Sequence, residues 1–327
     1  MYQLNAYSCG SGSSDLLFTG DNLDYKDFQI ARIPWNLKVI KLSGVVGIGI
    51  DNEERAWFWS EGLKIMLKPN VTKIACGWTH VLFISEEKAY SYGQGAFGQL
   101  GLGNVKRCAN PENLQINGCI NVGCGFRTSF VITREGTFCF GENRGYQLGL
   151  PIKSNIKEPT LNPLIEIPGI IEGGNKHTAS LNKGRLFVWG QNNYGQLGIL
   201  AMESQVPTQV NFHKEISQIG CGWYHTAFST VDKELYITGR GDLGQQGNGE
   251  TSNSNEFKLI MSDVDGFSCG SEHNLAISNG RVFSWGWNEH GNLGIGTQEN
   301  QVVPLQVSIE NPIRVICGGA ISYIISS

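Results

Sequence analysis

Cysteine and histidine recur in this 327-residue chain at a regular interval, and the side chains of both can bind metal ions. Five of the nine cysteines keep a spacing of 48 or 49 residues once Gly173 is counted at the one vacant position, and these are Cys76, Cys124, Cys221, Cys269 and Cys317. A metal-binding ring is one interpretation, but a zinc site needs converging ligands at short spacing, and the chain has no CxxC pair. We favour small buried residues at equivalent strand positions, since free cysteine behaves as a small hydrophobe. We therefore expect no metal and no cofactor.

The histidines divide into a periodic set and an irregular set. His80, His177, His225 and His273 occupy the same repeat position, which predicts a structural hydrogen-bonding role. His213 and His290 lie outside this register, and His290 belongs to the loop Trp287–His290, where we expect a contact role. The sequence contains neither HExxH nor GxxxxGK[ST], and no helix is expected after Gly239–Gly241 to bind a phosphate. These residues predict no enzymatic activity.

The composition narrows the classes of partner. The net charge is −4 and no run of lysine and arginine occurs, so nucleic acid is not the leading partner. Residues Met1–Gly10 lack the features of a secretory signal, and no apolar stretch reaches the roughly 18 residues of a membrane span. Nine cysteines without a leader indicate reduced thiols. We expect a protein of the cytoplasm, and also of the nucleus, without membrane contact.

The period of about 48 residues indicates one repeated supersecondary unit. In the clearest copy, Cys221–Gly247, two β-prone runs flank the polar segment Val231–Glu234, which predicts a hairpin. In another copy the turn is Asn279–Gly280, a strong hairpin signal. A glycine-bounded loop follows each hairpin and reads GQGAFGQLG, GENRGYQLG, GQNNYGQLG, GRGDLGQQG or GWNEHGNLG, beginning at Gly93, Gly141, Gly190, Gly239 and Gly286.

Units of three or four short strands with no helix predict a β-propeller. The strand-ending position recurs at Gly10, Ser60, Gly93, Gly141, Gly190, Gly239 and Gly286. We therefore predict an all-β fold, a single seven-bladed propeller over residues 1–327, with six blades as the alternative. The second blade is shortened, because only 33 residues separate Ser60 from Gly93 and no GQLG-type loop lies between them. The terminal segments 4–10 and 317–327 supply one strand each and close the ring.

The phrases CGxxH, a strand ending in WG, and NxxGQLG resemble the regulator of chromosome condensation repeat family, and the resemblance covers nearly the whole chain. Within that family, residues Cys269–Thr297 are similar to a blade of the secretion-regulating guanine nucleotide exchange factor and to the fungal alpha-tubulin suppressor proteins. The resemblance implies seven blades. For the fungal members it implies partnership with a small zinc protein that carries electrons for diphthamide synthesis and supports Elongator-dependent wobble-uridine modification of tRNA.

A hairpin brings its two ends to one edge, so the residue after CG and the loop after WG should share one face of the disc. Aromatic and charged side chains concentrate there, and such residues dominate protein interfaces. We predict a protein-binding rim formed by Trp78, Arg127, Tyr194, Trp223, Tyr224, Arg240, Glu272, Trp287, Glu289 and His290. The alternative for Trp78 and Trp223 is that they cap the gaps between blades.

The expected function is that of a non-catalytic protein-binding propeller, a partner and regulator of the zinc electron carrier. The alternative is guanine nucleotide exchange on a Ran-like small GTPase. In the founding family member, exchange depends on a β-wedge that projects from a blade, and repeats of 47 to 49 residues leave no room for one. Ubiquitin-ligase relatives carry a large catalytic domain that is absent here, and light-sensing relatives depend on GWRHT repeats. The matching triplets in this chain read GWT, GFR, GNK, GWY and GSE.

Overall fold

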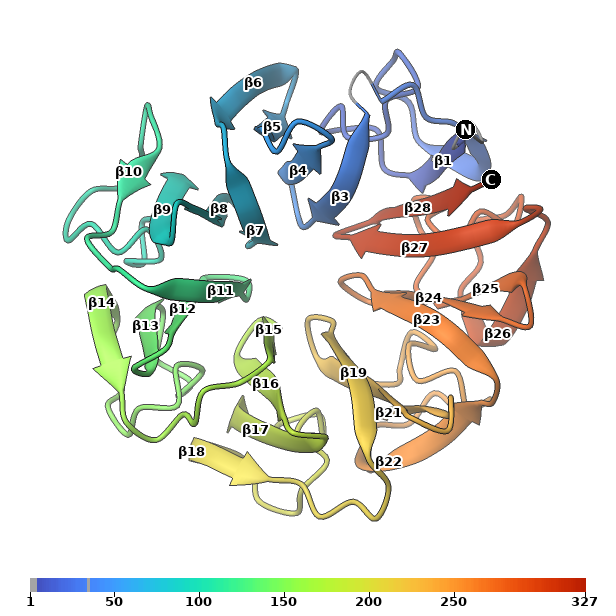
Figure 1. The fold of residues 1–327 in the computed structure, drawn as a ribbon. Coiled ribbons are helices and arrows are strands. Elements are labelled where there is room, and N and C mark those ends of the chain that lie inside the picture. Colours follow the sequence, from blue (N-terminus) through green and yellow to red (C-terminus); the bar gives the residue numbers. More distant parts are fainter. Residues whose placement is uncertain (1–4, 34–35) are drawn as a thin grey trace.

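The computed structural model describes residues 5–33 and 36–327, and its 28 strands form seven four-stranded antiparallel sheets. The sheets stand as blades around a central axis (Figure 1). This confirms the all-β propeller and selects seven blades over six. In the described residues no helix is long and apolar enough to cross a membrane.

Each blade runs from an inner strand at the axis to an outer strand at the rim, and blades 1 to 7 are given in that order. The inner strands are β27 (Pro312–Gly318), β3 (Leu37–Leu42), β7 (Val71–Cys76), β11 (Cys119–Cys124), β15 (Ile170–Gly173), β19 (Ile216–Cys221) and β23 (Val264–Cys269). The second strands are β28 (Ile321–Ser326), β4 (Gly47–Asp51), β8 (His80–Ser85), β12 (Thr128–Thr133), β16 (His177–Asn182), β20 (His225–Thr230) and β24 (His273–Ser278).

The two strands farther from the axis complete each blade. The third strands are β1 (Asn5–Gly10), β5 (Ala56–Ser60), β9 (Lys88–Gly93), β13 (Thr137–Gly141), β17 (Arg185–Gln191), β21 (Leu235–Gly239) and β25 (Arg281–Gly286). The outer strands are β2 (Tyr25–Ile30), β6 (Leu63–Lys68), β10 (Glu112–Asn113), β14 (Ile156–Asn162), β18 (Glu203–Gln209), β22 (Ser254–Met261) and β26 (Gln301–Val307).

Blade 1 joins the two chain ends. Strand β28 pairs with β1 from Asn5 opposite Ser326 to Gly10 opposite Ile321, so the last strand of the chain lies beside the first described strand. The predicted closure of the ring is confirmed, although the first residue of the predicted N-terminal strand, Leu4, lies outside the described residues. Ring closure protects the edges that an open sheet would expose.

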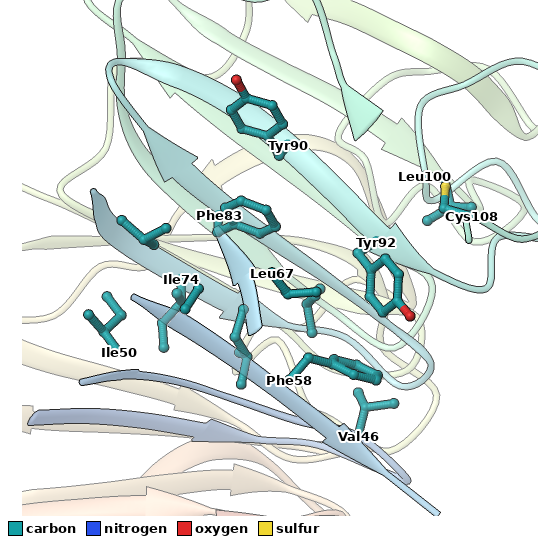
Figure 2. Close-up of a cluster of buried hydrophobic side chains, with 14 residues drawn as sticks. Val46, Ile50, Phe58, Leu67, Ile74, Phe83, Tyr90, Tyr92, Leu100 and Cys108 are labelled. Carbon is teal, nitrogen blue, oxygen red and sulfur yellow. The ribbon is translucent and has the colours of Figure 1, made fainter. Parts of the chain in front are cut away.

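Blade 2 is short but complete. Its third and outer strands are joined by Glu61 and Gly62 alone, both with positive φ, in place of the long glycine-rich loop of the other blades. A hydrophobic cluster packs blade 2 against blade 3, and Figure 2 shows Phe58 and Leu67 facing Phe83 and Tyr92. The rings of Phe58 and Tyr92 meet edge to face with centroids 4.9 Å apart. The shortened blade therefore keeps its place through apolar packing.

The hairpins fix two faces of the disc. His80 pairs with Gly93 and His273 pairs with Gly286, so the segment after CG and the loop after the third strand lie at one edge, as predicted. We call this side the loop face. The turns between second and third strands define the opposite side, the turn face. One of these turns is Asn279–Gly280, and both residues have the positive φ that a type I′ hairpin requires.

The four periodic histidines hold neighbouring blades together. Each is fully buried, and its Nε2 lies 2.9–3.0 Å from a polar side chain of the next blade, in the pairs His80–Ser129, His177–Thr226, His225–Asn274 and His273–Ser322. In three pairs the hydroxyl donates its only proton to a backbone carbonyl of the glycine-rich loop, and Asn274 offers its carbonyl oxygen to His225. Each histidine must therefore donate from Nε2. The predicted structural role is confirmed.

A steric constraint explains why glycine follows cysteine in the CG phrase, and Gly270 illustrates it. A Cβ added there would lie 2.1 Å from Cε1 of His273, because the imidazole packs flat against the backbone. The same contact recurs at Gly77, Gly174 and Gly222. Burial also lowers the pKa of these histidines, to about 4 for His80 and His225 and to about 3 for His177 and His273. The rings are neutral at physiological pH.

Candidate protein-binding face and central channel

Three aromatic side chains meet over the axis on the loop face. The rings of Trp78 and Trp223 lie 5.2 Å apart, and Phe126 lies 4.8 Å from Trp78 and 5.7 Å from Trp223. Trp78 reaches across to blade 2, where a Cβ on Gly44 would lie 2.1 Å from its ring. The two tryptophans thus cover the end of the channel, rather than only the gaps between blades. Contact with a partner stays a prediction for both.

A line of backbone hydrogen bonds supports this aromatic cover. Trp78 N–H donates to the carbonyl of Phe126 at 3.1 Å, and Trp223 N–H donates to that of Ser271 at 2.8 Å. Related bonds join Phe126 to Gly174, Asn175 to Trp223, Ser271 to Gly319 and Val45 to Trp78. Because these hydrogen bonds join the segments of neighbouring blades, the backbone that carries the aromatic rings is held in place.

Below the aromatic cover, one layer of side chains faces a channel of about 700 Å³. Strand pairing places the following residues at equivalent positions of the seven inner strands: Lys41, Ala75, Gly123, Glu172, Gly220, Ser268 and Ile316. The two charged members come from blades 2 and 5, and Lys41 Nζ lies 3.2 Å from Glu172 Oε1. The Lys41–Glu172 ion pair therefore crosses the axis within this layer. Of the other five positions, two are glycine and two carry the small side chains of Ala75 and Ser268, so the long charged side chains have room to meet.

The periodic cysteines form the adjacent layer. All nine cysteines are free, and the five periodic ones line the channel beside Gly173 and Leu42, which occupy the same position in blades 5 and 2. Burial raises the pKa of Cys76 and Cys221 far above its usual value, so both are protonated thiols. Residues 5–33 and 36–327 contain no group of three or more histidine, cysteine or acidic side chains that could hold a metal ion.

A compact cluster on blades 5 to 7 gathers several of the predicted contact residues. The rings of Tyr194 and Tyr224 lie 4.9 Å apart, and the guanidinium of Arg240 lies 5.6 Å from the centroid of Tyr194. Arg240 Nη1 donates to Glu272 at 3.0 Å, and its Nε lies 2.7 Å from Asp242. We call Tyr194, Tyr224, Arg240 and Trp287 the loop-face strip. Trp287 is included because it lies on the same face in blade 7, directly after β25, where its backbone N–H donates to the backbone carbonyl of Glu272.

Glu272 differs from the other predicted contact residues because its side chain is only 5% exposed. It accepts hydrogen bonds from Arg240 and from Gln245 Nε2 at 2.8 Å. Burial raises the pKa of Glu272, while Gln245 and Arg240 act in the opposite direction. The structure therefore corrects the prediction for Glu272: it positions Arg240 and does not itself present a surface to a partner.

Arg127 is held in a similar way on blade 4. Its guanidinium lies 3.9 Å from the ring centroid of Phe97 on blade 3, and Nη1 lies 3.6 Å from the buried carboxylate of Glu142. Cation–π contacts of this kind stabilise by about 0.5–1 kcal/mol at exposed sites. Arg127 keeps 36% of its side chain exposed. It is an ordered cation on the loop face, apart from the strip.

The remaining predicted residues lie near the junction of blades 7 and 1. His290 stacks edge-on against Trp287 at 5.3 Å, and its Nδ1 lies 2.7 Å from Asp24 Oδ2. Glu289 is exposed and forms no ion pair among the described residues. Sequence reasoning missed Asp24, because blade 1 lacks the Gln-Leu pair that aligns the other loops. It also missed Lys41 and Glu172, since neither belongs to a repeated phrase.

Comparison with known proteins agrees with this geometry. A family model described as the regulator of chromosome condensation (RCC1) repeat matches residues 183–229 and 279–325, and a second model of that description matches residues 216–245. The chain is 29% identical over 299 residues to the secretion-regulating guanine nucleotide exchange factor of Bos taurus, with 80% of this chain and 64% of that protein covered. It is 30% identical over 274 residues to the ultraviolet-B receptor UVR8 of Arabidopsis thaliana, with 76% and 61% covered.

The chain thus spans less than two thirds of the length of these curated relatives. Among solved structures, Prp20p from Saccharomyces cerevisiae superposes with a TM-score of 0.87 over 99% of this chain and 91% of that one, at 19% identity, which is a likeness of fold. The repeat matches, the identity to relatives and the seven blades agree: the chain carries regulator of chromosome condensation (RCC1) repeats and is similar to proteins of that family over most of its length.

Proposed function

We propose that this chain is a non-catalytic propeller that binds a small folded protein through its loop face. The observation that carries the proposal is the support of Arg240, 24% exposed, by a buried Glu272 beside two partly exposed tyrosines. Tyr, Trp and Arg contribute most to interface energy when their positions are fixed before binding. The loop-face strip combines all three residue types.

The proposed partner is the small zinc protein that carries electrons for diphthamide synthesis and supports Elongator-dependent tRNA modification. This choice rests on the resemblance to the fungal members of the family. In this proposal the propeller covers one side of the small protein and controls access to its metal. With such a partner, we expect the chain in the cytoplasm and also in the nucleus.

A small GTPase of the Ran type is the second candidate, and the relatives favour it. The Bos taurus protein is named a guanine nucleotide exchange factor, and the Prp20p structure is described together with binding to Gsp1p and histones. One structural observation favours docking over exchange. All 28 strands of the described residues belong to the seven sheets, so those residues contain no further hairpin that resembles the β-wedge of the founding member.

Pull-down with the purified zinc protein, beside a nucleotide-release assay on a panel of small GTPases, separates the two candidates. We expect retention of the zinc protein and no faster nucleotide release. Release accelerated by sub-stoichiometric propeller from any GTPase would reverse the ranking.

A paired substitution locates the binding face. Trp287→Ala with Glu289→Ala should weaken binding about tenfold or more, because it removes an aromatic anchor and a free carboxylate. Lys183→Ala, at an exposed turn-face position, is the matched control and should bind like the unchanged protein. Equal affinity of all three proteins would move the site away from the loop face.

A further inference from the structure

The central channel has two unlike ends. The loop-face end is covered by Trp78, Phe126 and Trp223, whereas the turn-face end is lined by residues in the first half of the inner strands, such as Thr72, Asn121 and Gln218. Its volume of about 700 Å³ falls within the range of small-ligand sites, about 300–1,000 Å³. The open end therefore offers a concave site on the side of the disc opposite the loop-face strip.

The charges that line this channel do not balance. Glu172 pairs with Lys41 at 3.2 Å, and Asp265 pairs with Lys233 at 2.8 Å. Two further cations that line the channel, Lys73 and Arg314, form no ion pair among the described residues. The lining holds three cations (Lys41, Lys73 and Arg314) and two carboxylates (Glu172 and Asp265), a net charge of +1, and Lys73 and Arg314 are the two cations without an ion pair.

The two unpaired cations lie at equivalent positions. Arg314 is opposite Ile325 in blade 1 and Lys73 is opposite Ile84 in blade 3, so both stand in the same layer of inner strands, on either side of blade 2. Arg314 Nη1 donates to the carbonyl of Lys38 at 3.2 Å, which fixes one edge of the guanidinium on blade 2. Its remaining N–H donors are available to a ligand, and a guanidinium suits the oxygens of phosphate or carboxylate.

We propose that the turn-face end of the channel binds an anion with two or more negative charges, held between Lys73 and Arg314. Polyphosphates and runs of carboxylates share this chemistry. Lys41, two residue positions deeper in the channel, is the third cation, and Glu172 competes with the ligand for it. This site is independent of partner binding at the loop face, because the aromatic cover separates the two.

Titration calorimetry with tripolyphosphate and with hexaglutamate peptide tests the site and distinguishes the two sources of charge. We expect one of these probes to bind, and to bind more weakly as salt increases. Lys73→Glu with Arg314→Glu should abolish binding, because it replaces both cations by carboxylates that repel an anion. The variant should still fold, since both side chains are exposed and the reversal buries no charge. Lys73→Met with Arg314→Met serves if the reversed protein does not fold.

The control is Lys26→Glu with Lys106→Glu, which makes the same change of net charge at exposed positions outside the channel lining. It should leave affinity unchanged. Glu172→Gln should raise affinity about three- to tenfold, because it removes the competing carboxylate and frees Lys41. Failure of both probes to bind at about 1 mM contradicts the proposal, as does binding that survives the Lys73 and Arg314 substitutions.

Discussion

Lys41 and Glu172 are 131 residues apart in the chain and form an ion pair across the propeller axis, with Nζ and Oε1 3.2 Å apart. Their side chains are 48% and 33% exposed to the channel. The carboxylate of Glu172 is the main cause that raises the pKa of Lys41, so the ammonium stays charged. The pair links blade 2, which lacks the glycine-rich loop, to blade 5 on the far side of the ring.

The first prediction concerns this pair. In a double-mutant cycle of Lys41→Met and Glu172→Gln, the coupling free energy should be about 0.5–1 kcal/mol, because both groups keep part of their hydration. Urea unfolding of the four proteins measures it. Coupling that is unaffected by 1 M salt would show that the channel screens the pair from solvent ions, contrary to its exposure.

Acid should destabilise the propeller through its buried histidines. An unfolded histidine takes up a proton near pH 6.5, whereas the folded pKa is about 3 to 4, so the folded state binds fewer protons between these values. Stability is therefore fully present above pH 6.5 and decreases as the pH falls, by about 1.4 kcal/mol per pH unit for each histidine. Denaturant midpoints measured from pH 7.5 to 4.5 should show this slope.

Two histidine variants test whether the buried histidines cause this pH dependence of stability. His273→Gln keeps a side-chain donor for Ser322 but cannot titrate, so the pH dependence should become shallower by about one proton. His213→Gln, at an exposed position outside the repeat register, should change nothing. Identical slopes in both variants would assign the acid sensitivity to other groups.

Two glycines of strand β23 and the segment after it give a matched test of the CG phrase. Gly270→Ala should destabilise by about 3 kcal/mol, because its Cβ would lie 2.1 Å from Cε1 of the fully buried His273 ring and 2.9 Å from the backbone oxygen of Gly318. Gly266→Ala meets no atom within 4 Å and should change the free energy of unfolding by less than about 1 kcal/mol. Thermal unfolding compares the two; a similar loss in both would refute the steric reason.

Substitutions of Glu272 and Glu289 compare the stability contribution of a buried supporting residue with that of an exposed one. Glu272→Ala leaves donors of Arg240 and Gln245 without their acceptor and should cost about 2 kcal/mol of stability. Glu289→Ala removes an exposed, unpaired carboxylate and should stay within about 0.5 kcal/mol. Calorimetric unfolding measures both, and equal effects would mean that the buried hydrogen bonds of Glu272 contribute little.

The sequence pattern was sufficient for the fold because each repeat carries its own local signals. CG, the hairpin turn and the strand-ending glycine lie within about 20 residues of one another, and their hydrogen bonds recur in each copy. Even the degraded second blade was located, since Ser60 marks the end of its third strand. The candidate site was predicted less completely: its face followed from the hairpin geometry, but burial of Glu272 depends on Gln245 in a neighbouring blade.

By itself, the sequence determined the period, the seven blades, the closure by the two ends and the structural role of the histidines. Only the tertiary structure decided that Trp78 and Trp223 meet over the axis and that Lys41 reaches Glu172 beneath them. The physical reason is that a repeat specifies contacts within a blade and with the next blade, whereas contacts across the channel join blades three apart. Those contacts depend on the diameter of the closed ring and on which side chains are long enough to span it.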